Sequence, residues 1–159
     1  MKLFDRFDKV YCINLKKRTD RLENFTQEVN KYDLGKFEVF EAIDGSTVGL
    51  HPTLLKGEMG IIHSVIKILE ISIQNKYEKI LILEDDCVFN DNVKEIDNYF
   101  SYLPENWDMI YFGGNHNTHV GIPPPVIINK RIVKLHCTFS AHCIGIKKNM
   151  FVHFFINLI

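Results

Sequence analysis

The sequence has no excess of either charge. Its 19 Lys and Arg residues nearly balance its 20 Asp and Glu residues, which gives a formal net charge of -1. Proteins that bind nucleic acids through phosphate contacts usually carry a basic surface. The balanced composition therefore argues against a nucleic-acid partner.

Long apolar runs are also missing. No run approaches the roughly 18 residues that a membrane-spanning helix needs. The first eight residues, "MKLFDRFD", are rich in charge, whereas a secretory signal has an apolar core before a small-residue cleavage site. We expect a cytoplasmic protein without a transmembrane segment, and peripheral association with a membrane stays open.

Cysteine is scarce, and none of it has the C-x-x-C spacing of many metal and redox sites. The four cysteines are Cys12, Cys87, Cys137 and Cys143. Reduced thiols are the simplest interpretation. The stretch "HCTFSAHC" (136–143) offers zinc-type ligands, but on one strand its cysteines share one face and its histidines the other. Buried strand cysteines are therefore preferred over a zinc site.

Strand and helix patterns alternate along most of the chain. Apolar, β-rich runs predict strands, and apolar residues at helical spacing predict helices that cover them. The strands are expected at 9–15, 36–42, 78–86 and 107–114, with further strands after 125 that turn near Asn129 and Lys130. The helices are expected at 19–34, 57–75 and 93–103, and Thr19 or Asp20 is expected to cap the start of the first. This order predicts one domain over residues 1–159, an α/β three-layer sandwich with a mainly parallel central sheet.

Three consecutive acids, Glu84, Asp85 and Asp86, end the third predicted strand. Ligands of open α/β sheets bind outside the carboxyl ends of the strands. A divalent cation there would neutralise the crowded carboxylates, and Mg²⁺ and Mn²⁺ prefer such oxygen ligands. The alternative is that the acids cap the following helix and face solvent. The three acids by themselves do not decide between a metal site and a helix cap.

Five blocks together resemble glycosyltransferase family 25, which includes bacterial lipopolysaccharide-modifying galactosyltransferases and procollagen galactosyltransferases. No single block decides this, but their order and spacing are fairly specific, and the resemblance runs from about Val10 to Met150. The blocks are "INLKKRTDR" (13–21), "AIDG" (42–45), "KGEMGIIHS" (56–64), "ILILEDD" (80–86) and "WDMIYFGG" (107–114).

The resemblance implies a GT-A-type fold, a UDP-sugar donor and Mn²⁺ or Mg²⁺ as cofactor. It implies that "EDD" stands for the family's metal motif, in which Asp86 is the expected Mn²⁺ ligand. Glu84 would join it at the metal or bind the ribose, and Asp85 would contact the ribose or a metal-bound water.

Four further residues are assigned to donor binding beside this motif. Asn14 ends the first strand, where a base or ribose can be hydrogen-bonded. Arg18 and Arg21 flank a helix start that attracts anions, and their guanidinium groups match phosphate oxygens; a solvated helix start is the alternative. Asp44 is expected to accept the uracil N–H, unless it only forms the Asp-Gly turn.

The chain departs from the family pattern at Ser64, which the family usually follows with His. Here Val65 follows and His63 precedes, and one helical step turns a side chain by about 100°, so His63 is no simple substitute. The loop after the fourth strand, with Gly113 and Gly114, is expected to form a wall for the donor sugar or the acceptor.

The resemblance implies an inverting hexosyltransferase that moves galactose from UDP-galactose to a glycan, a lipooligosaccharide or hydroxylysine. Such a transfer needs a general base, to which no residue is assigned. The family continues beyond "IGIKKNM", so part of the acceptor site is expected to be missing, and the apolar end, with Phe151, Phe154, Phe155 and Leu158, would seek an oligomer partner or a completing subunit. A nucleotide-sugar-binding remnant is the alternative function. A phosphoacceptor receiver domain fits less well, because that fold has its acid pair after the first strand.

Overall fold

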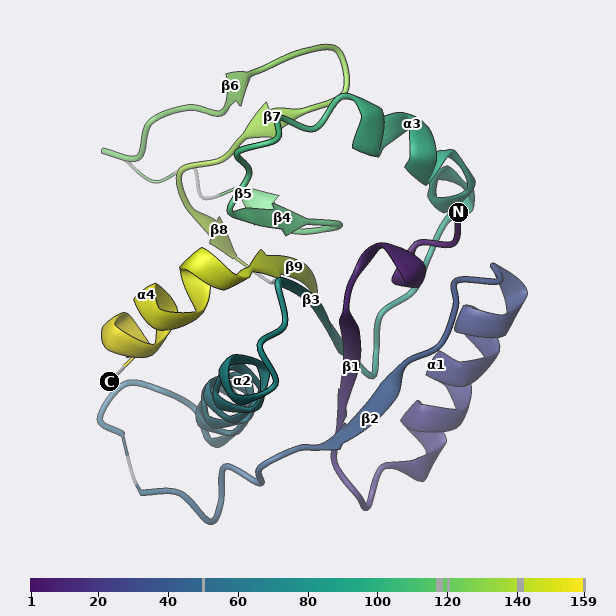
Figure 1. Ribbon diagram of the computed structural model, residues 1–159. Coiled ribbons are helices and arrows are strands. Elements are labelled where there is room, and N and C mark those ends of the chain that lie inside the picture. The colour runs from purple at the N-terminus through teal and green to yellow at the C-terminus, as the bar shows by residue number, and fades with distance from the viewer. Residues whose placement is uncertain (50, 117–118, 120, 140–141, 159) are drawn as a thin grey trace.

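A computed structural model describes residues 1–49, 51–116, 119, 121–139 and 142–158 (Figure 1). The helices are α1 (Thr19–Lys31), α2 (Lys56–Gln74), α3 (Ile96–Ser101) and α4 (Lys148–Leu158), with short 3-10 turns at Phe4–Arg6 (η1) and Asp91–Glu95 (η2). The strands are β1 (Lys9–Asn14), β2 (Glu38–Glu41), β3 (Lys79–Glu84), β4 (Met109–Tyr111), β5 (Asn115–His116), β6 (Val126–Ile127), β7 (Val133–Lys134), β8 (Thr138–Phe139) and β9 (Cys143–Lys147).

Five strands form the central sheet in the order β2-β1-β3-β9-β4. β1 pairs in parallel with β2 and β3, whereas β9 is antiparallel to both β3 and β4. The four strands expected from the sequence therefore all run in one direction in one sheet, as predicted. The insertion of β9 between β3 and β4 was not expected from the pattern.

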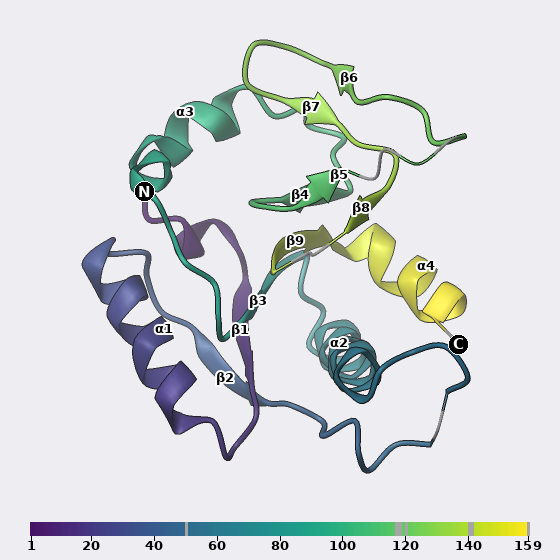
Figure 2. The ribbon, with the colours of Figure 1, turned by 180° about the vertical axis from the view of Figure 1, so that it is seen from behind.

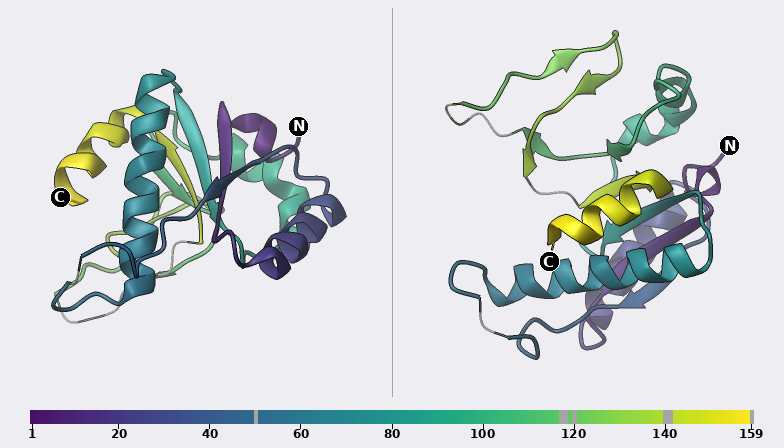
Figure 3. Two further views of the ribbon diagram at one scale, coloured as in Figure 1. Left: turned by 90° about the horizontal axis from the view of Figure 1, so that it is seen from below. Right: turned by 60° about the vertical axis from the view of Figure 1, so that its left-hand side comes forward.

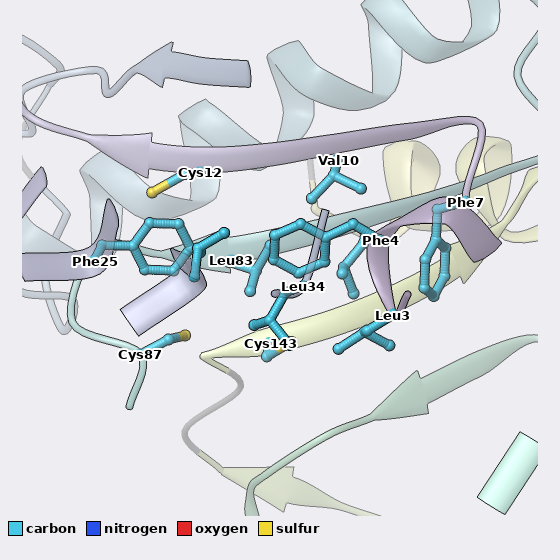
Figure 4. Close-up of a cluster of buried hydrophobic side chains, with 12 residues drawn as sticks. Leu3, Phe4, Phe7, Val10, Cys12, Phe25, Leu34, Leu83, Cys87 and Cys143 are labelled. Atoms are coloured by element: carbon cyan, nitrogen blue, oxygen red, sulfur yellow. The ribbon is translucent and has the colours of Figure 1, made fainter. Parts of the chain in front are cut away.

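Helices cover both faces of this sheet, which gives three layers (Figures 2 and 3). α1 and η1 lie on one face, where Phe25, Val29 and Phe4 pack against Cys12 and Leu83 (Figure 4). α2 and α4 lie on the other face, against alternate residues of the same strands. Burial on both faces explains the near-continuous apolar runs of β1 and β3. The three-layer α/β sandwich with a mainly parallel sheet is confirmed, and it is the arrangement that a GT-A-type fold leads one to expect.

Several local expectations were wrong. Arg18 stands at the N-cap of α1 and its side chain makes no capping hydrogen bond, so neither Thr19 nor Asp20 caps the helix. The helix expected near 93–103 is divided into η2 and the shorter α3. Phe151 is buried against α2 and the sheet, so it does not await a partner; the side chains of 154–158 lie outside the described part. Within the described residues, no helix is long and apolar enough to cross a membrane.

Two glycines bring the loop after β2 against the start of α2. A Cβ on Gly60 would lie 2.6 Å from the carbonyl oxygen of Ile43, and one on Gly45 would lie 1.6 Å from that of Lys56. The buried hydroxyl of Ser64 accepts the Ile43 N–H at 2.9 Å and donates to the Gly60 carbonyl. The "AIDG" and "KGEMGIIHS" blocks are thus one packed unit, and Ser64 has a structural part in it.

Candidate active site

The three acids after β3 lie in two different environments. Asp85 is buried, whereas Asp86 is exposed and Glu84 is partly buried. Glu84 and Asp86 both approach His142, and Asp85 approaches Asn14 instead. β3 ends at Glu84, and Asp85 and Asp86 lie in the turn that follows, in which the Cys87 N–H donates to the Glu84 carbonyl at 3.2 Å. This turn separates the directions of the three side chains, and each acid has a polar partner at the strand end.

Asp85 is held by two elements at once. The Asn14 Nδ2 donates to Asp85 Oδ2 at 2.7 Å and to the Arg18 carbonyl at 3.0 Å. Asn14 ends β1 and is only 4% exposed, so this contact is buried. The Arg21 guanidinium, from the first turn of α1, donates to Asp85 Oδ1 and to Asp86 Oδ2, both at 3.2 Å. These bonds fix the acid loop to β1 and α1.

Glu84, Asp86 and His142 form a separate cluster whose potential ligand atoms all lie within 4.8 Å of one another. The His142 Nδ1 is 3.1 Å from Glu84 Oε1 and 3.6 Å from Asp86 Oδ1. Because Arg21 binds the other oxygen of Asp86, Oδ1 stays directed toward His142. Two elements distant in the sequence therefore bring three ligand groups to one point.

His142 reaches the acids because β9 pairs with β3. Its carbonyl oxygen accepts the Glu84 N–H at 2.9 Å and the Cys87 thiol at 2.7 Å, and Cys143 pairs with Leu83. Sequence reasoning missed this residue, since it treated 136–143 as one strand. β8 ends at Phe139 and β9 begins at Cys143 in another sheet, so that single-strand view was wrong.

Burial shifts the acid–base behaviour of this corner. The pKa of Glu84 is raised, chiefly because burial disfavours its carboxylate, while His142 acts in the opposite direction. Burial likewise raises the pKa of the Cys87 thiol to about 12, so this cysteine is neutral at ordinary pH. A cation beside Glu84 would offset the cost of keeping its carboxylate charged.

The donor set fits a divalent transition-metal ion. Two carboxylates suit Mg²⁺ and Mn²⁺ alike, and the imidazole nitrogen favours a first-row transition ion over Mg²⁺. Asp86 and Glu84 are thus the two acids available to a metal, and His142 adds a ligand that the sequence did not suggest. The oxygens of Asp85 are bound to Asn14 and Arg21, which ties the loop to β1 and α1. Its predicted contact with the ribose or a metal-bound water stays a prediction.

A pocket of about 350 Å³ adjoins the cluster, lined by Asp86, His142, Phe112, Gly113 and Gly114 among others. Small-molecule sites commonly have this size. Nothing lies within 4 Å of where a Gly113 Cβ would stand, so that glycine faces open space. A larger hollow, of about 700 Å³, lies at the amino ends of β1 and β2. Four of its charged side chains are joined in ion pairs, Lys2 with Asp33 and Lys9 with Glu38, so we assign the site to the smaller pocket.

The match to a known family covers almost the whole chain. Residues 7–152 match glycosyltransferase family 25, described as an LPS biosynthesis protein family. The chain belongs to glycosyltransferase family 25. The resemblance inferred from the five sequence blocks is therefore confirmed.

Named relatives agree with this assignment. The chain is 28% identical over 151 residues to a putative glycosyltransferase, R655, of Acanthamoeba polyphaga mimivirus, covering 86% of this chain and 45% of that protein. It is 25% identical over 131 residues to human procollagen galactosyltransferase 2, covering 67% of this chain and 21% of that protein. The chain thus spans less than half the length of either relative.

A solved structure is also similar. A crystal structure of a glycosyltransferase involved in the glycosylation of the major capsid of PBCV-1 aligns with a TM-score of 0.49 at 12% identity, covering 94% of this chain and 64% of that one.

The other two donor-binding residues predicted for this family 25 chain have local partners. Arg18 binds Asp20 through two hydrogen bonds, which holds the pKa of Asp20 at about 2. Asp44 accepts the Ser46 N–H and binds Lys17 at 2.9 Å, and these bonds lower its pKa. Both side chains follow strand ends of the same sheet, but neither has a described bond to the acid cluster. Their roles at the donor stay predictions.

The capping interpretation of the triplet does not hold. The next helical turn, η2, is capped by Asn90, whose side chain accepts the Asn92 N–H at 3.0 Å. Residues 87–89 separate this cap from Asp86. The acids therefore do not serve a helix start.

We expect Asn14→Ala to lower the free energy of unfolding by about 2–3 kcal/mol, because it removes a hydrogen bond to a buried charged group and leaves that group less satisfied. Urea unfolding measures the change. Asn24→Ala, at an exposed position of α1, is the control and should leave stability unchanged or slightly raised. Equal stability of the two variants would contradict the role given to the Asn14–Asp85 bond.

Proposed function

We propose that this family 25 chain is a metal-dependent glycosyltransferase that moves a hexose, galactose first among candidates, from a UDP-sugar to a hydroxyl acceptor. The observation that carries the proposal is the cluster of Glu84, Asp86 and His142 beside an open pocket at the carboxyl end of β3. Family membership supports the transfer chemistry, and the human relative's name supports galactose.

Each group in the cluster has a distinct task in this proposal. Glu84, Asp86 and His142 would hold Mn²⁺, and a bound ion would neutralise the diphosphate of the donor as it leaves. Arg21 keeps Asp86 turned toward His142, and Asn14 and Asp85 keep the loop rigid. Gly113 and Gly114 leave the pocket wall open to a sugar. The transfer is proposed to be inverting, to a glycan, a lipooligosaccharide or a protein hydroxylysine.

Donor hydrolysis tests this proposal without knowledge of the acceptor. A panel of UDP-sugars is incubated with the protein in Mn²⁺, in Mg²⁺ and in EDTA, and released UDP is measured. We expect hydrolysis of one UDP-hexose that requires the metal. Mn²⁺-dependent UDP binding without any turnover would favour the alternative, a nucleotide-sugar-binding remnant. Equal UDP binding in Mn²⁺ and EDTA would contradict the metal-bridged diphosphate.

His142 gives the sharpest variant for this assay. We expect His142→Ala to weaken Mn²⁺-dependent UDP binding by about tenfold or more, since even the loss of an outer-shell partner of a metal costs about ten- to a hundredfold. His136→Ala is the matched control, because His136 is exposed and is not part of the cluster. If both variants bind UDP as the unchanged protein does, His142 is not a ligand.

A further inference from the structure

We propose that the β6–β7 hairpin is a docking element for an anionic lipid bilayer. The hairpin, residues 122–134, joins β6 to β7 through a turn at Asn129 and Lys130 and extends away from the three layers (Figure 3, right). This inference does not rest on the transferase activity. It rests on exposure, on charge and on how the hairpin is attached.

Apolar side chains are exposed along the hairpin. Ile127 is 77% exposed, and Val126, Ile128 and Val133 are each between 45% and 47% exposed. They account for four of the ten strongly exposed large apolar side chains that the structure describes. Ile127 and Val133 are directly paired across the two strands, so their side chains share one face. Val126, next to Ile127 in the strand, lies on the opposite face, so both faces of the hairpin expose apolar side chains. Exposed apolar side chains gathered on one projecting element mark a contact with a membrane or another macromolecule.

The positive charge of this region favours an anionic partner. All 20 Asp and Glu residues of the chain lie between Asp5 and Asp108, so the last 51 residues contain none. The same segment has five Lys and Arg residues: Lys130, Arg131, Lys134, Lys147 and Lys148. Three of them lie in the hairpin, at exposed positions beside the apolar side chains. Apolar residues flanked by cations are the combination that binds an anionic bilayer surface.

Polar contacts between the described residues attach the turn of the hairpin to the segment 95–102. The Asn129 side chain donates to the Tyr102 carbonyl at 2.8 Å and accepts the N–H groups of Arg131 and Ile132. Arg131 also faces Glu95 at 3.5 Å, so part of its charge is already offset. Lys130 and Lys134 are therefore the cations that a lipid headgroup would meet. The Lys130 Nζ lies 4.9 Å from the centroid of the Tyr102 ring, and the residue is exposed there.

Attachment there would hold the candidate active site close to the membrane. Only residues 135–141 lie between the end of β7 and His142, so the chain connects the docking element directly to one residue of the cluster. An acceptor saccharide carried on a lipid would then be presented near the pocket.

Vesicle sedimentation tests the proposal. The protein is mixed with vesicles of phosphatidylcholine alone or with phosphatidylserine added, and the pelleted fraction gives an affinity. We expect binding to the mixed vesicles that weakens with added NaCl. The double variant Ile127→Ser, Val133→Ser should lower it by at least about tenfold. The double variant Lys130→Gln, Lys134→Gln should lower it by on the order of tenfold while leaving the apolar surface in place.

Ile73→Ser is the matched control, because Ile73 is an exposed apolar residue on α2; it should bind as the unchanged protein does. Circular dichroism and urea unfolding establish that each variant is folded. The proposal is overturned if the unchanged protein stays in the supernatant with both vesicles, or if both hairpin variants pellet normally. A third outcome would also overturn it: the unchanged protein binds no vesicles but self-associates in analytical centrifugation, and the apolar double variant does not self-associate. That result would assign the hairpin to contact with a second copy of the chain.

Discussion

Replacement of Asp86 by Asn should lower the affinity for UDP in Mn²⁺ by about ten- to a hundredfold and leave the affinity in EDTA unchanged. Asp86 directs one oxygen to His142 and the other to Arg21. The variant removes a negative ligand from a site that is built for a hard cation. Even an outer-shell loss at a metal site costs about ten- to a hundredfold. Isothermal calorimetry with UDP, with and without Mn²⁺, measures both affinities.

Metal-free stability should hardly change in the same variant. Removing one of three neighbouring carboxylates relieves repulsion, and the Arg21–Asp86 pair that is lost is partly exposed and contributes at most about 1 kcal/mol. Asp91→Asn is the matched control, since Asp91 is an exposed acid whose described partner is Lys94. It should affect neither measurement. Mn²⁺-dependent UDP binding that survives in Asp86→Asn would remove Asp86 from the metal site.

Replacement of Gly60 by Ala should lower the free energy of unfolding by about 1–3 kcal/mol, as overpacking against fixed atoms typically does. Helix propensity alone predicts the opposite sign, because Ala is favoured over Gly by about 1 kcal/mol within a helix. The added Cβ would lie 2.6 Å from the Ile43 carbonyl oxygen and 3.0 Å from the Gly45 nitrogen, and both are backbone atoms. The loop that carries Asp44 would have to move.

Gly57 supplies the control for this change within the same helix. A Cβ there meets nothing within 4 Å, so Gly57→Ala should raise stability by up to about 1 kcal/mol. Urea unfolding of the two variants compares them directly. Similar gains in stability for both would show that the loop and α2 are not in the close contact described.

Local patterns were sufficient to predict the elements that form the two buried faces. β1 and β3 have continuous apolar runs, which predict burial on both faces of the sheet, and α2 has an apolar stripe, which predicts the side of the helix that packs against the sheet. The start of α1 was harder to predict, because Thr19 and Asp20 are typical capping residues, whereas Arg18 occupies the N-cap without a capping hydrogen bond. Which residue occupies the N-cap depends on where the preceding strand ends, and the tertiary structure determines that position.

The candidate site could be predicted only in part. The acid triplet was visible because three carboxylates in a row are unusual at a buried strand end. The separate orientation of Asp85 depends on Asn14 and Arg21, which are distant from it in the sequence. The approach of His142 to Glu84 depends on the pairing of β9 with β3, two strands that are also distant in the sequence. The available signal was that His142 immediately precedes the apolar run "CIGI", which marks a strand end. The run itself does not indicate that this strand pairs with β3 in the antiparallel direction.

The place of β9 in the sheet also sets an order of assembly. Among the described pairings, β4 joins the sheet only through β9, and β9 in turn pairs with β3. β3 ends at Glu84 and β9 begins at Cys143, so a long segment of chain lies between them. Closing so long a loop is slow, because the chain loses conformational entropy before the new strand contacts can offset that loss. During synthesis β1, β2 and β3 emerge first, with the edge of β3 open and Glu84 and Asp86 apart from His142. The nascent chain therefore acquires the cluster late, in the same step that completes the sheet.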